Sequence, residues 1–227
     1  MIAIVKARSA GNHQDHDRAE FTADTLVHAV GCCLGLAGAA ALLNVAFNSA
    51  TKAGLVSLVV YLFGLLSMLG LSAAYNILPY AKVRLALRRL DHSAIYLMIA
   101  GTYTAVWAQM NSDAAPIVLL IAVWITAAIG IALKLLLPGR FDRLSLLLYL
   151  LLGWSGGLAF GPIARALPSV SVWLLAAGGI IYTIGVIFHR WERLRFQNAI
   201  WHGFVLVAAC CHYCAILYCV SHGSIRA

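Results

Sequence analysis

Long apolar runs, separated by short polar stretches, dominate the pattern of residues along this chain. Each run has roughly 18 to 25 residues, the length at which a helix crosses a hydrocarbon layer about 30 Å thick. Strands of a membrane barrel would alternate apolar and polar residues with a period of two, and these runs do not alternate. The sequence therefore predicts an all-α integral membrane protein with seven transmembrane helices, at residues 25–47, 54–78, 93–110, 115–137, 144–163, 170–188 and 199–220.

Composition agrees with a membrane protein and leaves little chain for anything else. Apolar residues make up 63% of the chain and charged residues 11%, whereas soluble domains carry about a quarter charged residues. The apolar surplus must face lipid. We expect a polar cytoplasmic segment over residues 1–19 and a single membrane domain over residues 20–227. No cleavable signal sequence is evident before the first span, so we expect that span to direct insertion.

The basic residues predict the orientation. All but three of the 16 Lys and Arg residues fall before the first span or in alternate loops of the seven-helix thread. Short loops rich in Lys and Arg stay in the cytoplasm, so the N-terminus is expected inside and the C-terminus outside, in a multi-pass protein of the cell (inner or plasma) membrane. A nucleic-acid partner is not expected, because the net charge of +8 is divided among short loops. The basic residues assigned to the inner side are Lys6, Arg8, Arg18, Lys82, Arg84, Arg88, Arg89, Lys134, Arg140, Arg143, Arg190, Arg193 and Arg195, against Lys52, Arg165 and Arg226 outside.

Ionisable residues recur every four positions at the start of the first span. Glu20, Asp24 and His28 lie on one stripe of a helix, and Gly31 and Gly35 continue the line. For Glu20 and Asp24, a favourable interaction with the positive end of the helix competes with a functional role. His28 has no such explanation and needs a partner, because ionisable groups at membrane depth are rare and usually functional.

Three further pairs of polar residues lie near the predicted cytoplasmic ends of other spans. Asp91 has two interpretations, a helix N-cap or a functional carboxylate. The pairs would meet at similar depth if their helices are neighbours; they are Ser72 with Asn76, Asp91 with His92, and Asn198 with His202. His212 lies about 15 Å deeper than His202 along its helix, and we expect a neutral histidine bonded across to another helix.

Glycines four residues apart predict faces on which helices approach closely. One such set is Gly31 with Gly35, and the other is Gly153 with Gly157 and Gly161. We expect both sets to act in helix packing.

The order of these motifs resembles one protein family. The motifs are Glu20-x3-Asp24-x3-His28-x2-Gly31, Ser72-x3-Asn76, the stretch 91–103 (DHSAIYLMIAGTY), Gly178-x3-Tyr182-x2-Gly185, and Asn198-x3-His202 with His212. They are similar to the successive motifs of the hemolysin III proteins, the bacterial branch of the progestin and adipoQ receptor superfamily, which includes the adiponectin receptors. The resemblance covers nearly the whole chain and implies seven helices with a cytoplasmic N-terminus.

The resemblance also implies a zinc site near the inner face. Its ligands would be a histidine at the end of the second span and an H-x3-H pair at the start of the seventh, with a Ser and an Asp nearby. In this chain the matching ligand positions are Asn76, Asn198 and His202, and the catalytic positions are Ser72 and Asp91. Because an amide suits zinc poorly, the sequence predicts an altered zinc site within a polar pocket that also includes Glu20, Asp24, His28, His92 and His212.

Three functions follow as hypotheses. The first is a hemolysin III-like membrane protein with a polar pocket on the cytoplasmic side and a lipid-responsive or membrane-homeostasis role. The second is a metal-dependent, ceramidase-like hydrolase of lipid amides or esters, in which Asp91 and His202 survive as ligand or base. The third is a pore-forming cytolysin, which physical chemistry disfavours because seven apolar spans have no evident soluble form. Membrane lipids are the expected partners, and the residues identify neither a substrate nor a protein partner.

Overall fold

The structure, a computed structural model, describes the backbone of residues 2–49, 51–78, 81–110, 117–137 and 141–223. Side chains are described from residue 18 onward within those ranges, apart from residues 49, 53, 81, 143 and 223. Some sequence-based expectations fall outside the described residues. They are the start of the fourth span at Ala115, the placement of Arg140 and Arg226, and the side chains of Lys6, Arg8 and Arg143.

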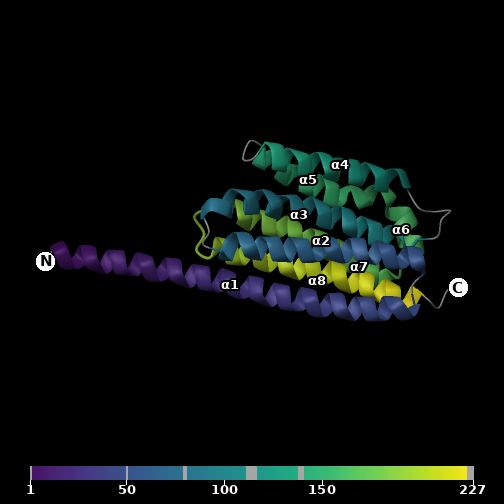
Figure 1. The fold of residues 1–227 in the computed structure, drawn as a ribbon, viewed down its shortest axis with the longest axis horizontal. Coiled ribbons are helices and arrows are strands. Elements are labelled where there is room, and N and C mark those ends of the chain that lie inside the picture. The colour runs from purple at the N-terminus through teal and green to yellow at the C-terminus, as the bar shows by residue number, and fades with distance from the viewer. Residues whose placement is uncertain (1, 50, 79–80, 111–116, 138–140, 224–227) are drawn as a thin grey trace.

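Helices running along one long axis make up the fold (Figure 1). Every element in the described ranges is helical, which confirms the all-α prediction. The first helix is long and extends beyond the others at its N-terminal end (Figure 1). The elements are α1 (Ile2–Ser49), α2 (Lys52–Ile77), α3 (Ala81–Trp107), α4 (Ile117–Leu136), α5 (Asp142–Trp154), a 3-10 turn η2 (Ser155–Ala159), α6 (Phe160–Ala166), α7 (Ser169–Arg190) and α8 (Gln197–Gly223).

The two larger of three apolar cores hold most of the bundle together. The larger core lies among α1, α2, α3 and α8, and its fully buried members include Leu42, Tyr61 and Ile216. The smaller core joins α3, α4 and α5 around Tyr96 and Val123. In this arrangement α1 packs against both α2 and α8, and α3 packs between α2 and α4. The first and last helices of the chain are therefore neighbours.

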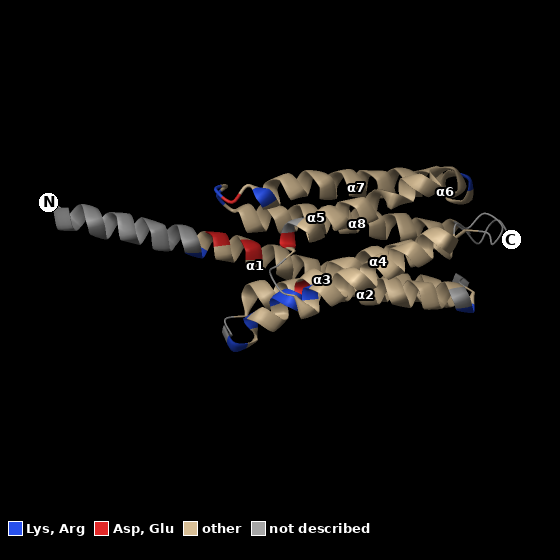
Figure 2. Cartoon of the chain, turned by 90° about the horizontal axis from the view of Figure 1, so that it is seen from above, with Lys and Arg blue, Asp and Glu red and all other residues tan. Residues whose placement is uncertain are grey.

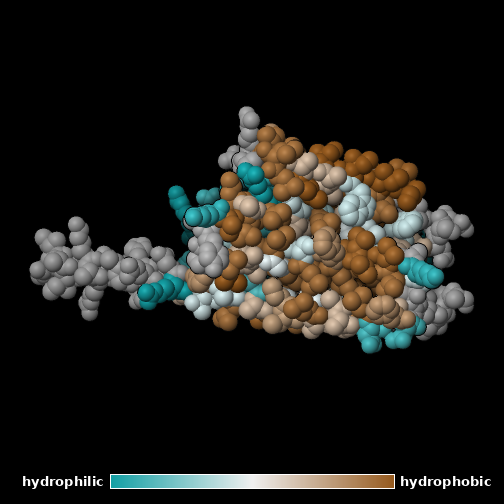
Figure 3. Space-filling view, in the orientation of Figure 1, coloured by the Kyte–Doolittle hydropathy of each residue, from teal (hydrophilic) through white to brown (hydrophobic). Residues whose placement is uncertain are grey.

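The outer surface is apolar along the middle of the bundle. Large side chains in the middle of their helices, such as Phe63, Ile125 and Ile180, are 63%, 56% and 50% exposed. Figure 3 shows apolar residues covering the middle of the visible face, with hydrophilic residues toward its two ends. Six of the described helical segments are long and apolar enough to cross a membrane. The chain is thus a multi-pass membrane protein, because such a surface is stable only against lipid.

Charged residues gather at one end of the bundle. Figure 2 shows most Lys and Arg at the end from which α1 projects, with smaller groups at the opposite end near α6 and the start of α2. Acidic residues of α1 lie at the same end as most of the Lys and Arg (Figure 2). We refer to this end as the basic end.

Two of the predicted helices differ from those in the structure, one in its start and one in its continuity. The third helix begins at Ala81 rather than near residue 93, so the basic stretch before Asp91 is helical. Asp91 therefore lies inside α3, and its interpretation as an N-cap is wrong. The fifth span is also interrupted, because its helix ends at Trp154 and resumes at Phe160 after a 3-10 turn.

Glycines mark close helix contacts in some of the predicted places and not in others. A Cβ atom on Gly35 would lie 2.6 Å from Cδ1 of Leu69, and one on Gly31 would lie 3.4 Å from Cδ2 of Leu69. This confirms a close contact of α1 with α2. By contrast, a Cβ on Gly153 or Gly157 would meet no atom within 4 Å. The packing role predicted for these two glycines was wrong, and they lie where α5 gives way to the 3-10 turn.

Gly64 and Gly101 let the backbones of α2 and α3 approach each other. A Cβ on Gly64 would lie 3.0 Å from the backbone of Leu97 and Met98. A Cβ on Gly101 would lie 3.1 Å from the backbone of Tyr61. Backbone atoms cannot rotate away as a flexible side chain can. These two positions thus fix the spacing of the helix pair that carries Ser72 and Asp91.

We expect Gly64→Ala or Gly101→Ala to lower the free energy of unfolding by about 1–3 kcal/mol, the usual cost of overpacking. Gly70→Ala is the matched control in α2, because a Cβ there meets nothing within 4 Å. It should leave stability unchanged or raise it by up to about 1 kcal/mol through helix propensity. Thermal unfolding in detergent, followed by circular dichroism, makes the comparison. Equal stability of all three variants would contradict the close approach of α2 and α3.

An ion cluster joins α3, α4 and α5 at the basic end. The Asp142 carboxylate accepts from Lys134 Nζ at 2.6 Å and from Arg88 Nη2 at 2.9 Å. Partial burial disfavours the ionised Asp142 carboxyl, but Lys134 and Arg88 outweigh that effect and hold its pKa below its ordinary value of 3.8. Lys134 is buried, so the carboxylate also compensates a cation inside the bundle.

The lowered pKa of Asp142 predicts an acid-sensitive contribution to stability. A carboxylate with a depressed folded-state pKa stabilises the fold above its ordinary pKa, and this contribution is lost as pH falls through the folded-state value. We expect the melting temperature of the wild type to drop below about pH 4, and Asp142→Asn to show a smaller drop because it lacks this proton site. The control is Glu192→Gln, which removes a carboxylate at an exposed position between α7 and α8. A melting temperature with the same pH dependence in wild type and Asp142→Asn would contradict the ion cluster.

Candidate functional site

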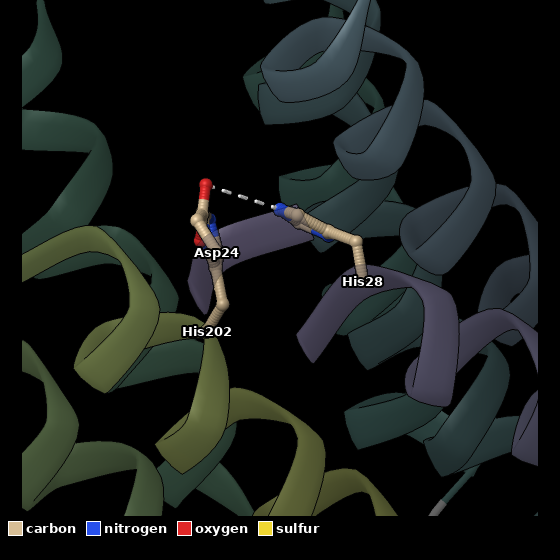
Figure 4. Close-up of side chains that lie close together, drawn as sticks. All are labelled: Asp24, His28 and His202. Atoms are coloured by element: carbon tan, nitrogen blue, oxygen red, sulfur yellow. Dashed lines mark hydrogen bonds and ion pairs between the residues drawn. The ribbon is translucent and has the colours of Figure 1, made fainter. Parts of the chain in front are cut away.

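Asp24, His28 and His202 come together at the basic end of the bundle. Asp24 and His28 are one turn apart on α1, and His202 lies in the second turn of α8 (Figure 4). One potential ligand atom from each residue lies within 4.8 Å of those of the other two. The direct packing of α1 against α8 makes this possible. Two helices at opposite ends of the sequence thus build one cluster.

Hydrogen bonding orders the cluster around the Asp24 carboxylate. His202 Nδ1 lies 2.6 Å from Asp24 Oδ1, and since an ionised carboxylate only accepts, the imidazole donates. A neutral His202 then keeps the lone pair on Nε2. The second carboxylate oxygen, Oδ2, lies 3.7 Å from His28 Nε2. The two imidazole rings are close, with centroids 4.3 Å apart.

The cluster is buried, and one of its polar atoms is unsatisfied. Asp24 and His28 are 8% and 6% exposed. His28 Nε2 is inaccessible to solvent and has no hydrogen-bond partner. A buried polar atom without a partner costs about 1–3 kcal/mol, and such atoms in native folds call for an explanation. The His28 ring thus contacts the Asp24 carboxylate at 3.7 Å without forming a hydrogen bond to it.

Asp91 and Ser72 lie next to this cluster, on α3 and α2. The Asp91 carboxyl lies within electrostatic range of His202 and beside the Ser72 side chain. Asn76 Nδ2 donates to the Ser72 carbonyl oxygen one turn earlier, at 2.9 Å. The structure therefore brings Ser72, Asp91 and His202 into one neighbourhood, and their catalytic or ligand roles stay predictions.

The remaining residues predicted for the site do not belong to one group. Asn198 is exposed, one turn before His202. Glu20 is half-buried, one turn before Asp24 on α1. His92 is half-buried and interacts electrostatically with Lys134 and the other charges of the ion cluster.

His212 lies deeper in the bundle and bonds to a neighbouring helix. Its Nε2 is 3.2 Å from the Leu175 carbonyl oxygen of α7, to which it donates. The glycine at position 178 makes room for the ring, because a Cβ there would collide with the His212 imidazole. This geometry accounts for His212 as a link between α7 and α8, separate from the cluster.

Zinc at the three positions implied by the family resemblance does not fit the residues present. Asn198 is exposed, and Asn76 uses its amide nitrogen within its own helix. An amide offers only a weak, hard oxygen, whereas zinc prefers imidazole and thiolate. His202 is the one histidine left at these positions.

Sequence reasoning missed how His202 is partnered. It grouped His202 with Asn76 and Asn198, whereas the structure pairs His202 with Asp24. A signal was present, because Asp24 and His28 share one helix face at a spacing of four. That spacing showed two of the three residues but could not show that α8 covers this face of α1.

Residues 19–213 match the family model described as haemolysin-III related. The chain is 34% identical over 202 residues to the hemolysin-3 homolog of Bacillus subtilis (strain 168), covering 88% of this chain and 95% of that protein. It is 34% identical over 200 residues to hemolysin-3 of Bacillus cereus, covering 88% and 91%. It is 30% identical over 165 residues to the human monocyte to macrophage differentiation factor, covering 69% and 67%. No solved structure matches significantly.

We expect a double-mutant cycle to show that Asp24 and His202 are coupled. The double variant Asp24→Ala/His202→Ala should lose less free energy of unfolding than the sum of the losses in the two single variants. The difference should be about 1.5–3 kcal/mol, as for hydrogen bonds to charged groups. The control cycle pairs Asp24→Ala with Asn198→Ala and should be additive within about 0.5 kcal/mol. Reversible unfolding in mixed micelles gives the energies, and an additive result for Asp24 with His202 would refute the contact.

Proposed function

Because the chain belongs to the haemolysin-III related family, we propose that it is a seven-span protein of the cell membrane with its basic end in the cytoplasm. The N-terminus is then inside and the C-terminus outside. The basic residues at the end from which α1 projects support this orientation (Figure 2), since Lys and Arg are retained on the cytoplasmic side. Six of the described helical segments are long and apolar enough to span the membrane. The additional span that makes seven is the apolar part of α3, which follows the basic first turns of that helix.

The function we propose is lipid-responsive: the protein binds a membrane lipid with its polar residues at inner-leaflet depth and serves membrane homeostasis. One observation supports it most, the buried cluster of Asp24, His28 and His202 beside Asp91 and Ser72. Ionisable groups at this depth are costly and are retained where they act. Lipid headgroups with hydroxyl, amide or ester groups offer the complementary donors and acceptors.

A second candidate is a metal-dependent hydrolase of lipid amides or esters. The observation that favours it is the Asp24–His202 pair, in which a carboxylate orients an imidazole at 2.6 Å. Such pairs serve general acid–base chemistry, and Asp91 provides a further carboxylate in reach of the same histidine. Lipid binding and lipid hydrolysis would use the same residues. Only hydrolysis would release a product.

A pore-forming cytolysin is the third candidate, and the name hemolysin-3 of two relatives makes it worth testing. The apolar surface argues against it. A protein that lyses another cell must first cross water, and large apolar side chains are exposed along α4 and α7. Lysis of erythrocytes by purified, well-folded protein at physiological salt would favour this candidate over the other two.

Photo-crosslinking in vesicles tests the lipid-binding proposal. The protein is reconstituted into phospholipid vesicles that contain a ceramide with a photoactivatable acyl chain, and crosslinked peptides are mapped by mass spectrometry. We expect labelling to concentrate on α1, α3 and α8 near Asp24, Asp91 and His202. Asp91→Leu should weaken this labelling by about tenfold, the factor that follows from losing about 1.4 kcal/mol of polar contact. Asp142→Asn, at the same end but in the ion cluster, is the control and should label like the wild type.

The same vesicles distinguish the candidates. Unchanged ceramide with site-directed labelling supports lipid binding, and released fatty acid that disappears in Asp91→Asn supports hydrolysis. Labelling spread evenly over the lipid-facing sides of α4 and α7, with no effect of Asp91→Leu, would rule out a lipid site at the cluster.

A further inference from the structure

We propose that Asp24, His28 and His202 bind a first-row divalent metal ion, with zinc as the ion to test first. This site differs from the one that the family resemblance implies, because α1 supplies two of its ligands and only His202 is shared. It stands apart from the proposed lipid function, since a metal ion bound here is measurable whether or not a lipid is bound or hydrolysed.

The donor set is suited to such an ion. Two imidazoles and one carboxylate are the protein ligands of many catalytic zinc sites, and they also suit other first-row ions. A tetrahedral ion with bonds of about 2.0–2.1 Å places its ligand atoms roughly 3.3 Å apart. His28 Nε2 and Asp24 Oδ2 are 3.7 Å apart, close to this value. All three ligand atoms lie within 4.8 Å, so side-chain adjustments of about 1.5 Å or less complete the set.

The unsatisfied atom of His28 points to a ligand. His28 is 6% exposed, and its Nε2 has no hydrogen-bond partner while it faces the Asp24 carboxylate. A metal ion between Nε2 and Oδ2 satisfies both atoms at once. Figure 4 shows the His28 ring directed at the Asp24 carboxylate, with His202 reaching the same group from α8.

Charge balance points the same way. Two carboxylates, Asp24 and Asp91, lie beside His202. In the ion pairs found among the described side chains, Asp24 pairs only with histidines and Asp91 pairs with no Lys or Arg. A divalent cation would offset the two negative charges at this buried place.

The packing of α1 holds the site in shape. Gly31 and Gly35 bring α1 close to Leu69 of α2, and they lie one and two turns beyond His28. The α1 ligands are thus fixed by a close helix contact, as metal sites on rigid elements require. Three protein ligands leave a coordination position open, which in such sites is taken by water or substrate. Asp91 and Ser72 lie beside His202, where they can hydrogen-bond to a group in that position.

The test is metal binding by the full chain in detergent. Protein purified without chelator is dialysed against ZnCl2 and then against buffer, and bound metals are counted by mass spectrometry of the elements. We expect about one ion per chain in the wild type, and a loss of about tenfold or more in affinity for His28→Gln and for Asp24→Asn. Titration with CoCl2 gives a second readout, because a four-coordinate cobalt site absorbs strongly in the visible range.

The controls separate this site from the alternatives. His92→Gln removes another half-buried histidine at the basic end, and it should keep the metal. Asn76→Ala and Asn198→Ala, at the family ligand positions, should also keep it. Monodisperse elution and unchanged helical circular dichroism show that each variant is folded. No bound ion in the folded wild type after dialysis with ZnCl2, or an ion lost from Asn76→Ala but kept in His28→Gln, would overturn the proposal.

Discussion

The contact of the first helix with the last is the constraint on which the site depends. Asp24 lies on α1 and His202 on α8, 178 residues apart in sequence, and they meet at 2.6 Å. In water such a pair would contribute little, but both groups lie largely buried in an apolar bundle, where an unpaired charge is expensive. The pair therefore fixes the register of α1 against α8, and His28, one turn along α1, is brought to the same carboxylate. Close contacts at Gly31 and Gly35 hold α1 to α2 on its other side.

Charge is distributed unevenly along this lipid-embedded bundle. Its middle carries large apolar side chains outward (Figure 3), and most Lys and Arg lie at its ends (Figure 2). At the basic end two clusters sit on different helices. Lys134, Arg88 and Asp142 compensate one another and join α3, α4 and α5. In the cluster of Asp24, His28 and His202, the Nε2 atom of His28 has no hydrogen-bond partner, and a second carboxylate, Asp91, lies nearby. The charged atoms of the first cluster are paired with one another, whereas the second keeps one buried ring nitrogen unpaired.

Sequence patterns predicted the helical membrane fold and the stripe of Asp24 and His28, because both follow from local periodicity. They failed where the structure depends on the membrane surface or on contacts between helices that are far apart in the sequence. The start of α3 was placed too late because a basic stretch at the membrane surface looks like a loop, although it forms helical turns. The glycines at 153 and 157 looked like a packing face, but they mark the end of α5, where no neighbour approaches within 4 Å. His202 was predicted to share a pocket with Asp24 and His28, but its direct contact with Asp24 was not foreseen, because spacing along one helix does not show which other helix covers it.

The central claim is that three side chains from two helices form one metal centre at the basic end. Anomalous diffraction at the zinc edge, from crystals of the full chain equilibrated with zinc, tests it most directly. The account predicts a single strong peak within about 2.0–2.2 Å of a nitrogen of His28, a nitrogen of His202 and an oxygen of Asp24. A peak beside Asn76 or Asn198, or density at the cluster that shows His28 still without a partner, would contradict it.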